Sequence, residues 1–135
     1  MTGTWTLEQW PVAERPDAWR HLVSRTHLPW RLDAERDADP AAVASITARP
    51  LDGLTLVDCS AGRCSGRRGR SEIGSTDGEY LAVLTVLDGC EHIAQGERRI
   101  VLRRGEALAW SSSQPLRFAI PQRLRKRTLL VPRAR

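Results

Sequence analysis

Short apolar segments separated by glycine- and proline-containing turns dominate the chain from residue 51 onward. The strongest of them, residues 80–87 (YLAVLTVL), is apolar on both faces and is therefore predicted to be a central strand. Further strands are predicted over residues 41–48, 54–59, 90–94, 98–103, 106–110, 116–120 and 128–131. Strands that recur at such short intervals are typical of an all-β sandwich or barrel.

The N-terminal part of the chain has a different pattern. Apolar residues between Trp19 and Val23 recur at helical spacing, which predicts a short helix over residues 17–26 that ends before Pro29. Residues 1–16 carry two tryptophans and two prolines without a periodic pattern, and we expect them to form an extended N-terminal arm.

The length of 135 residues is sufficient for one domain with one core. No apolar run approaches the roughly 18–20 residues that a membrane helix needs. The first ten residues do not contain the basic segment and apolar stretch of an export signal. A cytoplasmic protein is therefore expected.

The formal net charge of +5 is distributed unevenly, with −3 over residues 1–60 and +8 over residues 61–135. Such an asymmetry is compatible with a polyanionic or acidic partner. The basic residues cluster in residues 63–70 and 123–127, and both clusters are predicted to lie in loops or turns, the first within an irregular segment over residues 60–78. Neither cluster contains an aromatic residue on which a base could stack, so we interpret both as solvated surface rather than as a nucleic-acid interface.

The three cysteines, Cys59, Cys64 and Cys90, are an odd number, and no histidine stands near them at the spacing of a zinc ligand. We expect them to be unlinked thiols in a reducing compartment. Neither a metal nor a cofactor is predicted.

The order of strands and turns from Tyr80 to the end resembles the N-terminal ligand-sensing, cupin-like domain of AraC-type transcription regulators. The residues that match lie in the turns and short polar segments between successive strands: Gly89, Gln95-Gly96, Gly105-Glu106, Ser111 to Ser113 and Pro115. The resemblance extends over roughly residues 8–135. It implies a cupin-like double-stranded β-helix, or jelly-roll barrel, with residues 17–135 as the sensor domain behind the arm.

The same resemblance implies a function. In this family a small-molecule effector binds inside the barrel of a homodimer and controls DNA binding by a separate C-terminal helix-turn-helix domain, for which this chain has no room. Members act by binding rather than by catalysis, so an enzyme is not expected. Catalytic cupins hold a metal with several histidines and a glutamate, whereas this chain offers only His92 beside Glu91. Because neighbouring strand residues point to opposite faces, these two cannot both line the interior without a bulge.

Candidate ligand-binding residues follow from the predicted strands. Tyr80, Trp110 and Phe118 lie on three different strands and could enclose a small apolar or aromatic ligand, or simply fill the core. His92 is the candidate polar group of the pocket, although a histidine on a strand can equally be exposed. Trp30 could lie across the mouth of the barrel. The alternative function is a small stand-alone cupin-type enzyme or metabolite-binding protein that uses His92 and Glu106.

Overall fold

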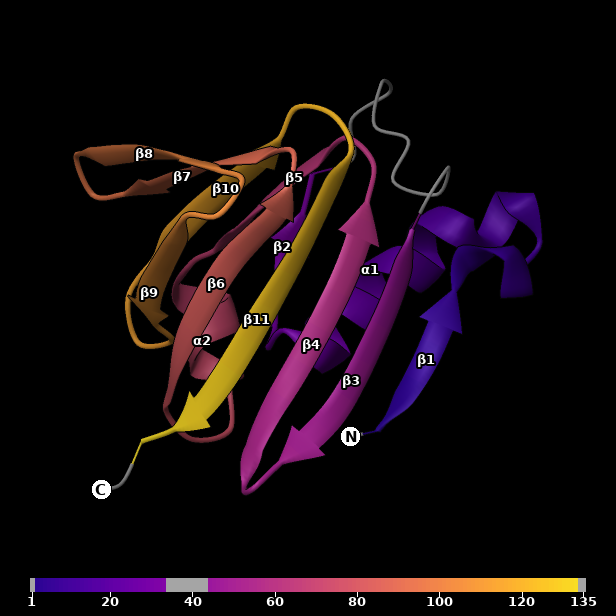
Figure 1. Ribbon diagram of the computed structural model, residues 1–135. Helices are drawn as coiled ribbons and strands as arrows, with labels where there is room; N and C mark the ends of the chain where they lie inside the picture. Colours follow the sequence, from indigo (N-terminus) through magenta and orange to yellow (C-terminus); the bar gives the residue numbers. More distant parts are fainter. Residues whose placement is uncertain (1, 34–43, 134–135) are drawn as a thin grey trace.

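The computed structural model describes residues 2–33 and 44–133. Two antiparallel sheets face each other, and the first helix lies beside them (Figure 1). One sheet has six strands, in the spatial order β1 (Gly3–Thr6), β3 (Ser45–Leu51), β4 (Leu54–Ala61), β11 (Leu124–Pro132), β6 (Tyr80–Asp88) and β9 (Ala107–Ser111). The other has five, in the order β2 (Arg31–Leu32), β5 (Cys64–Arg68), β10 (Leu116–Ile120), β7 (Cys90–Gln95) and β8 (Arg98–Arg103). The prediction of a mainly β fold with a short N-terminal helix is confirmed.

The apolar strand β6 occupies an interior position of its sheet, between β11 and β9, as its composition predicts. Ala82, Leu84 and Val86 alternate along it and are buried between the sheets. The residues between them face outward and are only half-buried. The period of two therefore places one side of each strand in a shared core.

Helix α1 (Arg15–Thr26) corresponds to the predicted helix and lies behind β3 and β4 in Figure 1. A proline stands in its first turn, where the missing N–H costs no hydrogen bond. Trp19, Leu22 and Val23 are buried, so the apolar side of the helix faces the core.

Residues 2–16 are more ordered than an extended arm. Strand β1 is extended, but it pairs with β3 and so forms an edge of the six-stranded sheet. Two short 3-10 turns, η1 (Leu7–Gln9) and η2 (Val12–Glu14), connect it to α1. Leu7 is 1% exposed, which ties this segment to the core.

The prediction of an irregular segment over residues 60–78 is wrong. Strand β5 and the short helix α2 (Arg70–Gly74) lie within it. The sequence of β5, CSGRR, lacks the β-branched and aromatic residues that mark strands. Gly66 is required there, because a Cβ at this position would lie 2.9 Å from the Phe118 ring and 2.9 Å from the Arg31 carbonyl oxygen.

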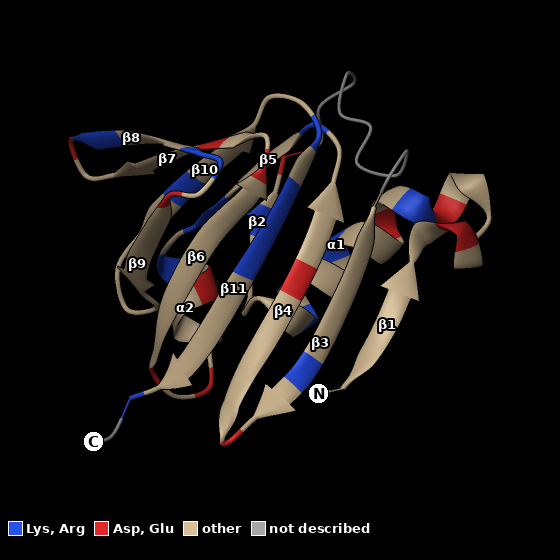
Figure 2. Ribbon diagram, viewed as in Figure 1, with Lys and Arg blue, Asp and Glu red and all other residues tan. Residues whose placement is uncertain are grey.

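The basic residues 123–127 do not form a turn either, because β11 begins at Leu124 and continues to Pro132. Basic residues therefore lie on strands, including β8, β10 and β11 (Figure 2). Of the strand predicted over residues 41–48, the first three residues lie outside the described ranges, and β3 begins at Ser45. No helix within the described ranges has the length and apolar composition of a membrane span.

Candidate functional site

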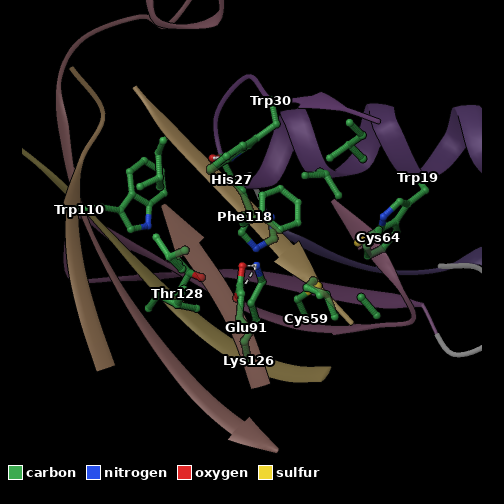
Figure 3. A pocket seen from close by; sticks show the side chains of 17 residues that line it. Trp19, His27, Trp30, Cys59, Cys64, Glu91, Trp110, Phe118, Lys126 and Thr128 are labelled. Atoms are coloured by element: carbon green, nitrogen blue, oxygen red, sulfur yellow. Dashed lines mark hydrogen bonds and ion pairs between the residues drawn. The ribbon is translucent and has the colours of Figure 1, made fainter. Parts of the chain in front are cut away.

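A small cavity lies between the two sheets, below α1 and the segment that follows it (Figure 3). Four aromatic side chains contribute to its wall: Trp19, Trp30, Trp110 and Phe118. The remaining lining is mostly aliphatic, with a few buried polar groups. Its free volume is about 30 Å³, which is room for one or two water molecules but not for an organic ligand.

Trp30 occupies much of the space between the sheets. Its ring meets Trp110 and Phe118 edge to face, with ring centroids 5.6 Å and 5.1 Å away, an arrangement that aromatic pairs prefer. The Trp30 indole N–H donates to the His27 carbonyl oxygen at 2.9 Å. The Ser24 hydroxyl donates to the Trp30 carbonyl oxygen and accepts from its backbone N–H. The end of α1 thus places this indole in the barrel.

Arg68 holds the Trp30 segment from the other side. This arginine of β5 points inward and is 1% exposed. Its guanidinium donates to the carbonyl oxygens of Pro29 (2.6 Å) and Ser112 (2.9 Å) and to the Thr76 hydroxyl (2.9 Å). It also lies 5.9 Å from the ring centroids of both Trp30 and Trp110. Burial lowers the pKa of Arg68, and the Glu72 carboxylate opposes that shift.

A buried ion pair joins the two sheets at the floor of the cavity. Both carboxylate oxygens of Glu91, on β7, lie 3.4 Å from the Lys126 Nζ, on β11. These side chains are 2% and 13% exposed, respectively. Burial, the largest single cause, lowers the pKa of Lys126, but the Glu91 carboxylate together with the nearby Cys59 and Cys64 outweighs it, so the pKa of Lys126 is raised and the amine stays protonated. The ammonium also lies 5.3 Å from the Phe118 ring centroid.

The alternation of β11 directs Lys126 inward. Leu124, Lys126 and Thr128 share the core face of this strand, and its pairing with β4 is regular throughout. Neither member of the ion pair was a candidate in the sequence. The available signal was the alternation Glu91, Ile93 on β7, which places the glutamate on the apolar face, and the single lysine among the basic residues.

Two polar atoms at the cavity have no hydrogen-bond partner in the described part of the chain: Trp19 Nε1 and His27 Nε2. The His27 Nδ1 lies 2.9 Å from the Thr26 hydroxyl, so only its other nitrogen is left over. Burial, with Lys126 nearby, lowers the pKa of His27 to about 3 and keeps the imidazole neutral. Unsatisfied buried polar atoms of this kind can bind a water or a ligand.

The buried state of His27 predicts an acid sensitivity. The unfolded chain binds a proton at His27 near pH 6.5, whereas the folded chain does so only near pH 3. Stability should therefore fall by about 1.4 kcal/mol per unit as the pH decreases below 6.5. Urea unfolding measures the free energy of unfolding at pH 7.5 and at pH 5.0. The decrease between these two pH values should be about 2 kcal/mol smaller in His27→Gln than in the parent chain.

The matched control is His21→Gln, which removes an exposed histidine from α1, the helix that His27 directly follows, and should show the same pH dependence as the parent chain. Equal pH dependence in all three chains would contradict a neutral, buried His27.

Two of the cysteines, Cys59 and Cys64, also line the cavity and are buried, whereas Cys90 is half-buried outside it. Burial is the main cause that raises the pKa of Cys59 to about 12, so its thiol stays protonated and unreactive. Within residues 2–33 and 44–133, no group of three or more His, Cys, Asp or Glu residues is placed to hold a metal ion.

The structure brings together three of the five candidate residues. Trp30, Trp110 and Phe118 line one cavity. Tyr80 is half-buried at the start of β6 and packs against the core, but it does not line the cavity. His92 is exposed on the outer face of β7, because Glu91 takes the inward position next to it.

The residues of the enzyme alternative do not lie in the cavity. His92 and Glu106 are both exposed, and the Glu106 carboxylate accepts the backbone N–H of Arg103 at 2.7 Å. The polar groups in the cavity wall include Glu91, Lys126 and His27. Their arrangement can orient a bound molecule by hydrogen bonding.

Comparisons with known proteins give a family and a fold. The sequence pattern of the AraC-binding-like domain matches residues 19–135. No curated protein matches the sequence significantly. Among solved structures, the AraC-like transcriptional activator CuxR is similar over 98% of this chain, with a TM-score of 0.81 and 16% identity. This chain covers 47% of that protein and so spans about half its length.

Two further structures have lower similarity. A regulator of the HTH_3 family from Vibrio cholerae has a TM-score of 0.54 and 15% identity, and the match covers 67% of this chain and 52% of that one. The Cupin_2 domain of an XRE-family regulator from Enterobacter cloacae has a TM-score of 0.51 and 7% identity, over 66% of this chain and 98% of that one. The cupin-like architecture expected from the sequence is confirmed by these neighbours.

Proposed function

The chain belongs to the AraC-binding-like domain family, and we propose that it is the effector-sensing domain of a transcription regulator. In this proposal a small molecule binds between the sheets, at the cavity lined by Trp30, Trp110 and Phe118. Residues 17–135 form the sensor unit, with residues 1–16 as an N-terminal segment. The domain acts as a homodimer, and a separate helix-turn-helix domain contacts DNA.

The observation that carries the proposal is the combination of an aromatic wall with unsatisfied polar atoms in a nearly filled barrel. Trp19 Nε1 and His27 Nε2 lack partners beside the Glu91–Lys126 pair. A core selected only for stability would not be expected to retain such groups, because each buried polar atom without a partner costs roughly 1–3 kcal/mol. A ligand that bonds to them would recover that cost.

The size of the cavity implies how a ligand enters. Because only about 30 Å³ is free, a ring-sized ligand must displace a side chain. The Trp30 indole is the candidate, since it is half-buried and lies on a connecting segment rather than on a strand interior. The ligand would take the place of the indole between Trp110 and Phe118.

The chemistry of the walls defines the ligand class. A flat ring suits the two remaining aromatic faces. The Glu91–Lys126 pair has no net charge, so the site favours an uncharged molecule with an acceptor atom for the Trp19 N–H. Because the Thr26 hydroxyl donates to the Leu22 carbonyl oxygen, the neutral His27 ring donates through Nδ1, and its Nε2 accepts a hydrogen bond from a donor group of the ligand. Displacement of the indole would break its hydrogen bond to the His27 carbonyl oxygen and so change the segment between the end of α1 and the start of β2. This change is the proposed signal to the rest of a regulator.

Removal of the Trp30 indole tests the proposal. Trp30→Ala should open the cavity and allow free indole to bind in the vacated space. Indole at about ten times its dissociation constant should stabilise this variant by about 1.4 kcal/mol, which raises Tm by about 4 °C. The measurement is thermal unfolding of the variant with and without indole.

Trp5→Ala is the matched control, because Trp5 is half-buried on β1 and does not line the cavity. Indole should leave the Tm of this control unchanged. An equal shift in both variants, or no shift in Trp30→Ala, would contradict a ligand site between the sheets.

A further inference from the structure

The outer face of the five-stranded sheet carries a row of arginines. Arg31 on β2 lies directly opposite Arg67 on β5, and Arg67 lies directly opposite Arg117 on β10. Directly opposed residues of antiparallel strands have Cβ atoms about 4.5–5.5 Å apart, so like charges there repel each other. All three side chains are exposed, and none forms an ion pair within the described residues.

A hollow of about 350 Å³ lies over this row. Arg31, Arg67 and Arg117 line it together with Arg70 of α2. The one acid in its wall, Glu72, already accepts the backbone N–H of Gly69 at 2.8 Å. The hollow therefore has a strong excess of positive charge, and its lining comes from the adjacent strands β2, β5 and β10 and from α2 and the residues beside it.

We propose that this hollow binds a small anion that carries two or more phosphate groups. Guanidinium groups bind phosphate oxygens in pairs, and arginines in one row can hold neighbouring phosphates at the same time. The bound anion would remove the repulsion between the opposed arginines. The hollow has the volume of a small-molecule site, and its lining contains no aromatic side chain on which a nucleic-acid base could stack.

This site differs from the cavity between the sheets. Arg67 points outward, whereas the next residue, Arg68, points inward to Trp30. Arg68 and Leu116 also contribute to the wall of the hollow, but the three opposed arginines, Arg31, Arg67 and Arg117, do not line the cavity. The anion site therefore does not depend on the proposed effector site.

Titration calorimetry of the chain with pyrophosphate tests the proposal. Arg67→Ala should weaken binding at least tenfold, because Arg67 is the middle member of the row and hydrogen bonds to charged groups contribute roughly 1.5–3 kcal/mol. Arg49→Ala removes the same charge from an exposed position on β3 of the other sheet and should weaken binding less than twofold. Orthophosphate should bind at least tenfold more weakly than pyrophosphate.

Thermal unfolding separates binding from folding. Arg67→Ala should have an unchanged or higher Tm without anion, since it relieves repulsion. Pyrophosphate should then raise the Tm of the parent chain but not that of the variant. Equal weakening by Arg67→Ala and Arg49→Ala, or no pyrophosphate binding at about 5 mM, would overturn the proposal. If a short DNA duplex binds more tightly than pyrophosphate and this binding depends on Arg67, the ligand of the hollow is a nucleic acid and the small-anion proposal is wrong.

Discussion

Glu91→Ala is expected to lower the free energy of unfolding by about 3–5 kcal/mol. The substitution leaves the Lys126 ammonium, which is 13% exposed, without the carboxylate with which it pairs. An unpaired charge in a low-dielectric interior is far more costly than the pair itself is stabilising. Urea unfolding at neutral pH measures the change.

The double variant Glu91→Leu/Lys126→Met removes both charges and should recover most of the lost stability. Glu106→Ala, at an exposed turn, should change stability by less than about 1 kcal/mol. If Glu91→Ala lowers the free energy of unfolding no more than Glu106→Ala does, Lys126 is not a buried charged group, and no buried ion pair forms the floor of the cavity.

Arg68→Ala is expected to destabilise the domain by about 3 kcal/mol. The truncation removes three hydrogen bonds from a charged donor and leaves the carbonyl oxygens of Pro29 and Ser112 without that partner. It also removes the guanidinium from the faces of Trp30 and Trp110. Trp30 should become more exposed to solvent, which a red shift of the tryptophan emission would report.

The adjacent arginine provides the control for this prediction. Arg67→Ala removes the same charge and side chain from the exposed face of the same strand, so it should cause neither the loss of stability nor the red shift. Equal effects of the two substitutions would show that Arg68 does not hold the Trp30 segment.

Much of the fold could be predicted because its signals are local. The apolar alternation and the turns from Tyr80 onward predicted β6 to β10 with small errors at their ends. The helical spacing around Trp19 predicted α1. Strand β5 could not be predicted, since CSGRR has the composition of a loop and becomes a strand only through pairing with β2 and β10.

The candidate site could be predicted where it depends on aromatic residues and not where it depends on charge. Trp30, Trp110 and Phe118 meet in the cavity. Their charge predicts Arg68 and Lys126 in solvent, whereas the alternation of β5 and β11 places both on the core face, where tertiary contacts hold them. On β7 the sequence analysis selected His92 as the polar group of the pocket, but the buried face of the strand carries Glu91, and His92 is exposed.

The central claim is that a ligand binds between the sheets and displaces the Trp30 indole. The most direct test is to follow the indole ¹⁵N–¹H resonance of Trp30 in the unmodified domain while free indole or one of a set of uncharged phenols is added. The Trp30 N–H donates to the His27 carbonyl oxygen at 2.9 Å, so displacement of the ring breaks an identifiable hydrogen bond. We expect at least one ligand to shift the Trp30 and Trp110 resonances while that of Trp5 stays in place. Ligand-induced shifts that leave Trp30 unchanged would contradict a sensor that binds its effector between the sheets.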